Sequence, residues 1–166
     1  RRKEALALNK VQSKQADAQI PSNPVTSAEG KLRKEHVTLD YISIDKTLGP
    51  EFLLVIKHNA LFTALLSELL KDFRCYAIIR NPLATIASWQ TVDLPIHSGH
   101  IPMGEYFDKK LESKLSSLNS TLDRQLLILR WFFEIFEKHL DRSQVIRYED
   151  IIAVSYTHLR AHETVL

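Results

Sequence analysis

The sequence predicts an α/β domain in which helices cover an incomplete parallel sheet. Two apolar runs, Phe52–Ile56 and Cys75–Ile79, have the length and composition of strands that are buried on both faces. Between them, Asn59–Phe73 carries leucines three and four residues apart, a spacing typical of a helix with one apolar face. A strand, a helix and a second strand form a unit whose strands pair in parallel through a right-handed crossover. Gln144–Tyr148 predicts a third strand.

Composition and charge exclude several classes of function. The 166 residues carry a net charge of +2 with both signs interspersed, which argues against nucleic-acid or other polyanion binding beyond a local site. The single cysteine, Cys75, excludes a disulfide framework, and its place in a predicted strand indicates a packing role. No apolar run approaches the roughly 20 residues that a membrane helix needs, and we expect a cytoplasmic protein.

Both ends of the chain indicate a fragment. The chain begins at Arg1 without an initiating methionine, and Met103 is its only methionine, so we expect the true N-terminus to lie upstream. Val154–Leu166 resembles the translated read-through of a sequencing adapter, which would carry no selected function. We therefore divide the chain into a helical tail and polar connector over residues 1–38, a partial α/β domain over residues 39–153, and a non-native tail over residues 154–166.

Local patterns predict the remaining elements. Arg1–Leu8 suits the end of an amphipathic helix, and Leu39–Ile44 alternates apolar and polar residues as in a short edge strand. Thr91–Lys109 contains several prolines and glycines and predicts a long irregular loop, a kind of segment that often binds ligands. Asp123–Leu140 is the strongest helical stretch, and its Trp131 is expected in the core.

The turn after Cys75–Ile79 has the features of an anion site. Arg80 ends the apolar run, and Pro82 suits the first position of a helix because its missing N–H would be unpaired there anyway. We expect free N–H groups and the positive end of the helix dipole to face the same place as the guanidinium. Ser88 adds a hydroxyl from the helix, and the planar fork of arginine suits phosphate.

Arg80-Asn81-Pro82, with Ser88 eight positions after the arginine, resembles the 3′-phosphate motif of sulfotransferases that use 3′-phosphoadenosine 5′-phosphosulfate (PAPS). Arg147–Asp150 also resembles the Arg-Tyr-Glu-Asp run that follows a late strand in that family, where we expect an architectural role. The resemblance implies a three-layer, parallel-sheet, P-loop-like fold and transfer of a sulfuryl group from PAPS, the co-substrate, without a metal. Arg80 and Ser88 would bind the 3′-phosphate, and the acceptor would be a hydroxyl of a small molecule or carbohydrate.

The resemblance also implies two catalytic residues, Lys57 and His58. In the family a corresponding strand ends in Lys-Thr-His, and the histidine is the catalytic base, whereas here the order is Lys57-His58-Asn59. A shift of one residue on a strand reverses the face to which a side chain points. A role for His58 in a loop or helix cap therefore stays open beside the catalytic role, and Lys57 can equally be a solvated lysine that closes a strand.

Rival functions stay open because the family's 5′-phosphosulfate loop is absent and no Walker A pattern replaces it. We expect the fragment to be inactive without that loop. The rivals are a P-loop nucleotide or small-molecule kinase and a non-catalytic nucleotide-binding module.

The histidines give no clear site. His97 and His100 fit either contacts with an acceptor substrate or exposed loop positions, and the exposed positions are favoured. His158 and His162 have metal-ligand spacing but no third ligand, so we assign no metal site.

Overall fold

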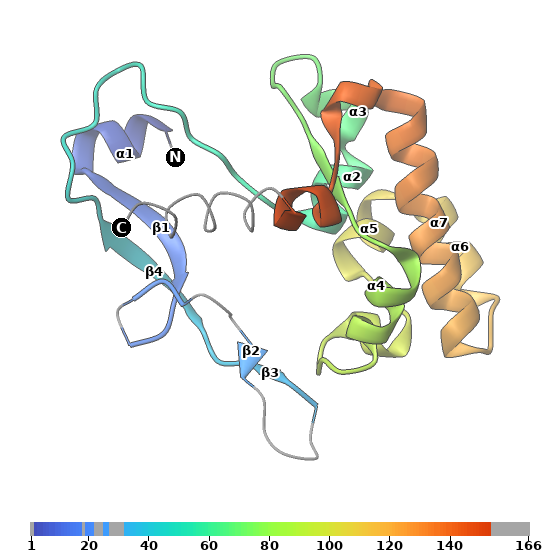
Figure 1. The fold of residues 1–166 in the computed structure, drawn as a ribbon. Coiled ribbons are helices and arrows are strands. Elements are labelled where there is room, and N and C mark those ends of the chain that lie inside the picture. The colour runs from blue at the N-terminus through green and yellow to red at the C-terminus, as the bar shows by residue number, and fades with distance from the viewer. Residues whose placement is uncertain (1, 18, 22–24, 27–31, 154–166) are drawn as a thin grey trace, which may run out of the picture. The chain divides into compact units, whose positions relative to one another are not determined.

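The computed structural model describes residues 2–17, 19–21, 25–26 and 32–153. These residues form a mixed α/β arrangement of helices and short sheets that includes one parallel strand pair (Figure 1). The chain divides into two compact units, one of Arg1–Lys57 with Thr91–Asp93 and one of His58–Gln90 with Leu94–Leu166. The first unit is mainly antiparallel ribbon, and the second is mainly helical.

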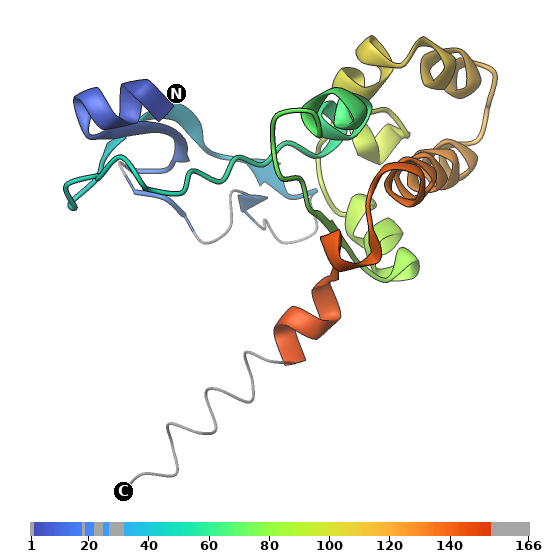
Figure 2. The same cartoon turned by 90° about the horizontal axis from the view of Figure 1, so that it is seen from above.

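The first unit is built on one long antiparallel ribbon. Helix α1 (Arg2–Leu8) leads into strand β1 (Lys10–Gln15), which pairs antiparallel with β4 (Thr38–Ser43) so that Lys10 lies opposite Ser43. Figure 2 shows α1 beside this ribbon. The predicted helix end and edge strand are confirmed, whereas part of the predicted polar connector belongs to strand β1.

A polar turn and a second ribbon complete this unit. Asn9, between α1 and β1, has φ of 50°, a left-handed conformation that asparagine tolerates better than most residues. Its side-chain amide donates to the Ile44 carbonyl over 2.5 Å, which ties the turn to the end of β4. Strands β2 (Val25–Thr26) and β3 (Lys34–Glu35) form the second, two-residue ribbon.

The predicted strand Phe52–Ile56 is not formed. Residues 52–58 have no regular secondary structure, and the side chains of Leu53 and Val55 are 87% and 79% exposed. An apolar run becomes a strand only where a neighbouring strand completes its backbone hydrogen bonds, and no described strand pairs with this one. The predicted parallel pairing between this run and Cys75–Ile79 is therefore wrong.

The described part of the second unit is mainly helical and includes two short strands (Figure 1). Its elements are, in chain order, α2 (Asn59–Ala64), α3 (Leu66–Leu69), β5 (Ala77–Ile79), α4 (Pro82–Trp89), the 3₁₀ helix η1 (Pro95–Ser98), α5 (Pro102–Phe107), α6 (Lys109–Ser116), α7 (Thr121–His139), the 3₁₀ helix η2 (Arg142–Gln144) and β6 (Val145–Arg147). Residues 148–153 are also helical. The predicted helix Asn59–Phe73 is present as α2 and α3, divided at Leu65, and the two helices predicted after Arg80 and over Asp123–Leu140 are confirmed.

The parallel pair consists of β5 and β6, so the third predicted strand is confirmed and supplies the partner of the second. One face of the pair packs into a small core, where Ala77 is buried with Leu66 and Leu140. Ile78 lies opposite Ile146 on the other face and is 61% exposed. The prediction that β5 is buried on both faces is therefore wrong, because only one of its faces is covered by described helices.

The larger core lies among α5, α6 and α7. Its buried side chains are Ile101, Leu111, Leu115, Ile128 and Trp131. The Trp131 indole N–H donates to the Asp108 carboxylate over 2.8 Å, which satisfies the one polar group of this buried ring. Trp131 is thus confirmed as a core residue.

The predicted irregular loop over Thr91–Lys109 is largely helical, so that prediction is wrong. Both η1 and α5 have a proline in their first turn, Pro95 and Pro102, where a missing N–H costs nothing. Gly99 ends η1 with φ of 79°, a conformation that glycine adopts without steric cost. The prolines and glycine that indicate a loop in the sequence therefore mark helix boundaries in the structure.

Candidate functional site

The predicted anion site lies where β5 ends and α4 begins. Asn81 caps α4, and its side-chain oxygen accepts hydrogen bonds from the N–H groups of Leu83 and Ala84 over 2.9 and 3.3 Å. The N–H of Asn81 itself donates to the Glu149 carboxylate over 2.8 Å. The prediction of free N–H groups at this helix start is therefore wrong for these three, because acceptors within the chain already bind them.

The Arg147–Asp150 run lies against this turn. Because β5 and β6 are parallel neighbours, their carboxyl ends share one edge of the sheet. The exposed Arg80 guanidinium lies over the Tyr148 ring, 5.3 Å from its centre, which is a cation–π contact. Together with the bond from Asn81 to Glu149, this contact ties the two strand ends together, as an architectural role requires.

Ser88, the second predicted phosphate ligand, lies about two helical turns beyond Asn81 near the end of α4 and is half-buried. Arg80 and Ser88 thus belong to one strand–turn–helix unit. Their surroundings differ, because the Arg80 guanidinium before the helix is exposed and the Ser88 hydroxyl near the end of the helix is half-buried.

Lys57 and His58 differ from the predicted catalytic pair. Lys57 is exposed and follows an irregular segment, so its predicted place at a strand end is wrong. His58 is the N-cap of α2, and its Nδ1 accepts a hydrogen bond from the Leu61 N–H over 3.3 Å. A nitrogen that accepts carries no proton, so the neutral ring bears its proton on Nε2. His58 therefore presents a donor at Nε2, and the structure shows it in the capping role.

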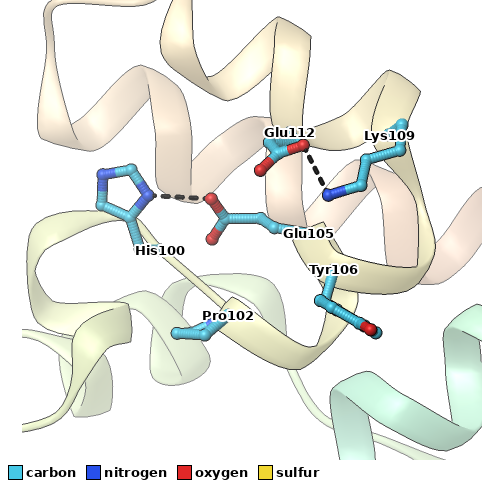
Figure 3. Close-up of a pocket in the computed structure, with 6 residues that line it drawn as sticks. All are labelled: His100, Pro102, Glu105, Tyr106, Lys109 and Glu112. Atoms are coloured by element: carbon cyan, nitrogen blue, oxygen red, sulfur yellow. Dashed lines mark hydrogen bonds and ion pairs between the residues drawn. The ribbon is translucent and has the colours of Figure 1, made fainter.

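His100 is held from both sides by charged side chains, an arrangement that the sequence patterns did not predict (Figure 3). Its Nδ1 lies 3.1 Å from one oxygen of the Glu105 carboxylate, whose other oxygen accepts the Ile101 N–H over 2.6 Å. Its Nε2 lies 3.4 Å from the Arg124 guanidinium. The sequence signal for part of this cluster is Glu105 in the first turn of a helix, where an acidic side chain is favourable.

The two arginines of α7, Arg124 and Arg130, lie in different surroundings. Arg124 is half-buried and donates through Nε to the Leu118 carbonyl over 3.0 Å. Arg130 is exposed and pairs with Glu134 four residues later, over 2.6 Å. Arg124 therefore has a structural role between two loops, and Arg130 is a solvated helix residue.

The other loop histidine, His97, also lies in packed surroundings. It is half-buried, with Nδ1 3.4 Å from the Trp89 carbonyl oxygen. The fully buried Gln125 amide donates to the His97 carbonyl over 3.2 Å. The favoured prediction of exposed loop positions is therefore wrong for both His97 and His100, which are half-buried.

Two open cavities share His100 as a wall. The first, of about 290 Å³, is lined by Pro102 together with polar and charged side chains and includes the Lys109–Glu112 ion pair, with N and O 2.9 Å apart (Figure 3). The second, of about 360 Å³, is lined by His58, His100, Ala60 and apolar residues of the segment 94–103. The structure thus brings His58 and His100 to one concave surface, which their distance in sequence does not reveal.

The described residues hold neither a metal-ligand cluster nor a membrane-spanning helix. Among them, no group of three or more histidine, cysteine, aspartate or glutamate side chains is placed to share a metal ion. His158 and His162 lie outside the described residues. Within residues 2–17, 19–21, 25–26 and 32–153, no helix combines the length and the apolar character that crossing a bilayer requires.

The turn lowers the pKa of the Glu149 carboxyl below its ordinary value. The main cause is the hydrogen bond from the Asn81 N–H, followed by a backbone hydrogen bond from Glu149 itself and the charges of Arg147 and Arg80, while desolvation acts in the opposite direction. Because the folded pKa is depressed, the ionised carboxylate stabilises the folded state above the unfolded pKa. That contribution is lost as the pH falls through the folded pKa.

We therefore expect acid to release the Asn81 N–H from Glu149. In an NMR titration from neutral to acidic pH, the amide shift of Asn81 should follow a midpoint below the usual pKa of a glutamate. Glu149→Gln should remove this titration while the Leu83 and Ala84 amides, which bond to Asn81, keep their shifts. An Asn81 amide that titrates equally in Glu149→Gln would contradict the assignment.

Comparisons with protein-family models, with curated proteins and with solved structures found no match.

Proposed function

We propose that this chain supplies the 3′-phosphate site for sulfuryl transfer from PAPS to a hydroxyl acceptor, within a three-layer P-loop-like fold whose 5′-phosphosulfate loop is not among these 166 residues. The observation that carries the proposal is the exposed Arg80 guanidinium at the carboxyl end of the parallel pair, directly before α4. In α/β proteins, ligands bind at this edge of the sheet. The motif of Arg80, Asn81, Pro82 and Ser88 resembles the 3′-phosphate motif of PAPS-dependent sulfotransferases. This resemblance is the reason for proposing that the bound anion is the 3′-phosphate of PAPS.

The proposal gives each residue a chemical task. Arg80 binds the 3′-phosphate of PAPS with its planar fork, and Ser88 donates its hydroxyl to the same group. The acceptor oxygen bonds to sulfur as the bond from sulfur to the 5′-phosphate oxygen breaks, the acceptor proton passes to water, and adenosine 3′,5′-bisphosphate is the leaving group. His58 contributes its Nε2–H as a donor, since Nδ1 is already an acceptor.

The Glu149 carboxylate opposes anion binding at this turn. The carboxylate accepts a hydrogen bond from the N–H of Asn81, the residue that follows Arg80 in the sequence. A phosphate bound near this carboxylate is repelled by its negative charge. A bound phosphate therefore requires Arg80 to supply more attraction than Glu149 supplies repulsion. Replacing the carboxylate by a neutral amide should accordingly tighten binding of an anion at Arg80.

Titration with adenosine 3′,5′-bisphosphate, followed by calorimetry, tests the phosphate assignment. Arg80→Ala should weaken binding by about ten- to a hundredfold, because a hydrogen bond to a charged group contributes about 1.5–3 kcal/mol. Arg130→Ala, which removes an equally exposed arginine from α7, should leave the affinity unchanged. Glu149→Gln should raise it. Equal affinity of Arg80→Ala and the unaltered chain would remove the assignment.

A non-catalytic nucleotide-binding module is the second candidate, and two observations favour it. The N–H groups of Asn81, Leu83 and Ala84 are bound within the chain, and the accepting nitrogen of His58 caps a helix. Such a module would bind the bisphosphate through Arg80 but transfer no sulfuryl group from PAPS. Incubation of a longer protein that joins this chain to a 5′-phosphosulfate loop with PAPS carrying labelled sulfur and a panel of alcohols, phenols and sugars separates the two functions.

A further inference from the structure

His100 connects two helices of the second unit through its two ring nitrogens. Nδ1 lies 3.1 Å from the carboxylate of Glu105 on α5, and Nε2 lies 3.4 Å from a terminal nitrogen of the Arg124 guanidinium on α7. A guanidinium only donates, so Nε2 accepts and the ring proton is on Nδ1, where the carboxylate accepts it. Both partners therefore select the same neutral tautomer of the imidazole.

The turn at Gly99 and His100 packs tightly against the start of α7. A Cβ added to Gly99 would lie 2.6 Å from the Arg124 Cβ. Arg124 also donates through Nε to the Leu118 carbonyl over 3.0 Å, and the buried Gln125 amide donates to two backbone carbonyls of η1. Of these contacts, the bond from Arg124 to His100 is the one that requires a neutral imidazole.

A second proton on the ring would break the contact with Arg124 and strengthen the contact with Glu105. The imidazolium is a donor at both nitrogens, so its Nε2–H and the guanidinium would meet as two donors of like charge. Nδ1–H keeps its acceptor, and the side chain of Glu105 is only 13% exposed, so water screens this attraction weakly. Imidazole changes its charge between about pH 8 and pH 5, so mild acid shifts the two contacts in opposite directions.

Other titratable side chains near this ring lie on four elements, and each has surroundings of its own. Lys109 and Glu112 on α6 pair with each other over 2.9 Å, and His58 caps α2. His97 on η1 lies against a backbone carbonyl of α4, and the phenol of Tyr106 on α5 lines the neighbouring cavity. The two direct partners of the ring therefore dominate its response to pH.

We propose that His100 is a pH-sensitive switch that holds the start of α7 when neutral and releases the Arg124 side chain when protonated. The guanidinium then leaves Nε2 but keeps its backbone partner, while His100 stays on α5 with Glu105. The amide bonds from α7 to η1 carry no titratable group, so the opening is confined to this contact. The switch is independent of the proposed anion site at Arg80.

Double-mutant cycles, measured by urea unfolding of the full chain at about pH 8 and about pH 5, test the switch. His100→Ala is combined with Arg124→Met in one cycle and with Glu105→Gln in the other. The coupling of His100 with Arg124 should favour folding about two- to tenfold at the higher pH and disappear or reverse at the lower pH. The coupling with Glu105 should instead grow about two- to fivefold on acidification, because the bond becomes an ion pair.

Arg130 and Glu134 supply the control, because this ion pair on the same helix contains no imidazole. The coupling between Arg130→Met and Glu134→Gln should be the same at both pH values. If the coupling of His100 with Arg124 is also the same at both, the proposal is wrong. A control coupling that changes as much as the coupling of His100 with Arg124 would likewise overturn it, since the response would not be specific to the imidazole.

Long-range ¹H–¹⁵N spectra of the unaltered chain give a second test that does not depend on the stability of any variant. They should show the His100 proton on Nδ1 at about pH 8 and protons on both nitrogens at about pH 5. The backbone amides of Gly99 and of residues 121–124 should shift with the same midpoint as the ring. A proton on Nε2 at the higher pH, or amides that do not follow the ring, would overturn the switch.

Discussion

Ile128→Ala should lower the free energy of unfolding by about 2–5 kcal/mol, the usual cost of removing a large aliphatic side chain from a packed core. Ile128 is fully buried on α7, in the cluster that also buries Leu115 and Trp131. The substitution removes three carbon atoms from a site where neighbours on two helices meet. Urea unfolding followed by tryptophan fluorescence measures the change, because Trp131 lies in the same core.

Leu126→Ala is the matched control for this substitution. Leu126 lies on the same helix, two residues before Ile128, but is 46% exposed. Its truncation should cost well under half as much, because less apolar surface returns to water. Equal losses for the two variants would show that α7 does not bury Ile128 as the structure has it.

Gly99→Ala should destabilise the second unit by about 2 kcal/mol or more. Gly99 has φ of 79°, and a non-glycine residue in the left-handed region costs about 1–2 kcal/mol. A Cβ at this position would also lie 2.6 Å from the Arg124 Cβ and 3.2 Å from the Thr121 carbonyl oxygen. Both atoms belong to the first turns of α7, so neither can move aside without disturbing that helix.

Two further substitutions separate strain from steric overlap at Gly99. Gly49→Ala introduces a Cβ with no heavy atom within 4 Å, and we expect it to change stability by no more than about 0.5 kcal/mol. Gly99→Asn tolerates the left-handed conformation better than alanine but brings the same Cβ against Arg124. If Gly99→Asn were as stable as the unaltered chain, the predicted overlap with α7 would be wrong.

The helix predictions succeeded where apolar spacing and end signals agree. Ser120 accepts the Asp123 N–H at the start of α7, and Asn81 with Pro82 begins α4, so side chains and backbone preferences mark the same boundaries locally. The segment over Thr91–Lys109 failed because proline is compatible with a turn and with a helix start. Only packing around Ile101 selects the helix.

The site predictions likewise succeeded where the signal lies in adjacent residues and failed where it depends on distant ones. The turn from Arg80 to Pro82 was placed correctly at a strand end followed by a helix, since each step depends on adjacent residues. The carboxylate that lies on this turn comes from Glu149, 68 residues later, and no local pattern pairs the two. His100 likewise acquires Arg124 from a helix that begins more than twenty residues further along the chain.

The sequence by itself determined helices α1, α2 with α3, α4 and α7, the strands β5 and β6 and the position of the arginine turn, because backbone preference and apolar spacing act over a few residues. Only the tertiary structure decided which strands pair, which apolar runs are covered and which acceptors bind the N–H groups at the start of α4. Phe52–Ile56 and Cys75–Ile79 have the same apolar character, yet one forms no strand and the other pairs with β6. The physical reason is that the hydrogen-bond partners of a strand and the side chains that bury it come from residues far away in the sequence. Local backbone preference carries no information about those residues.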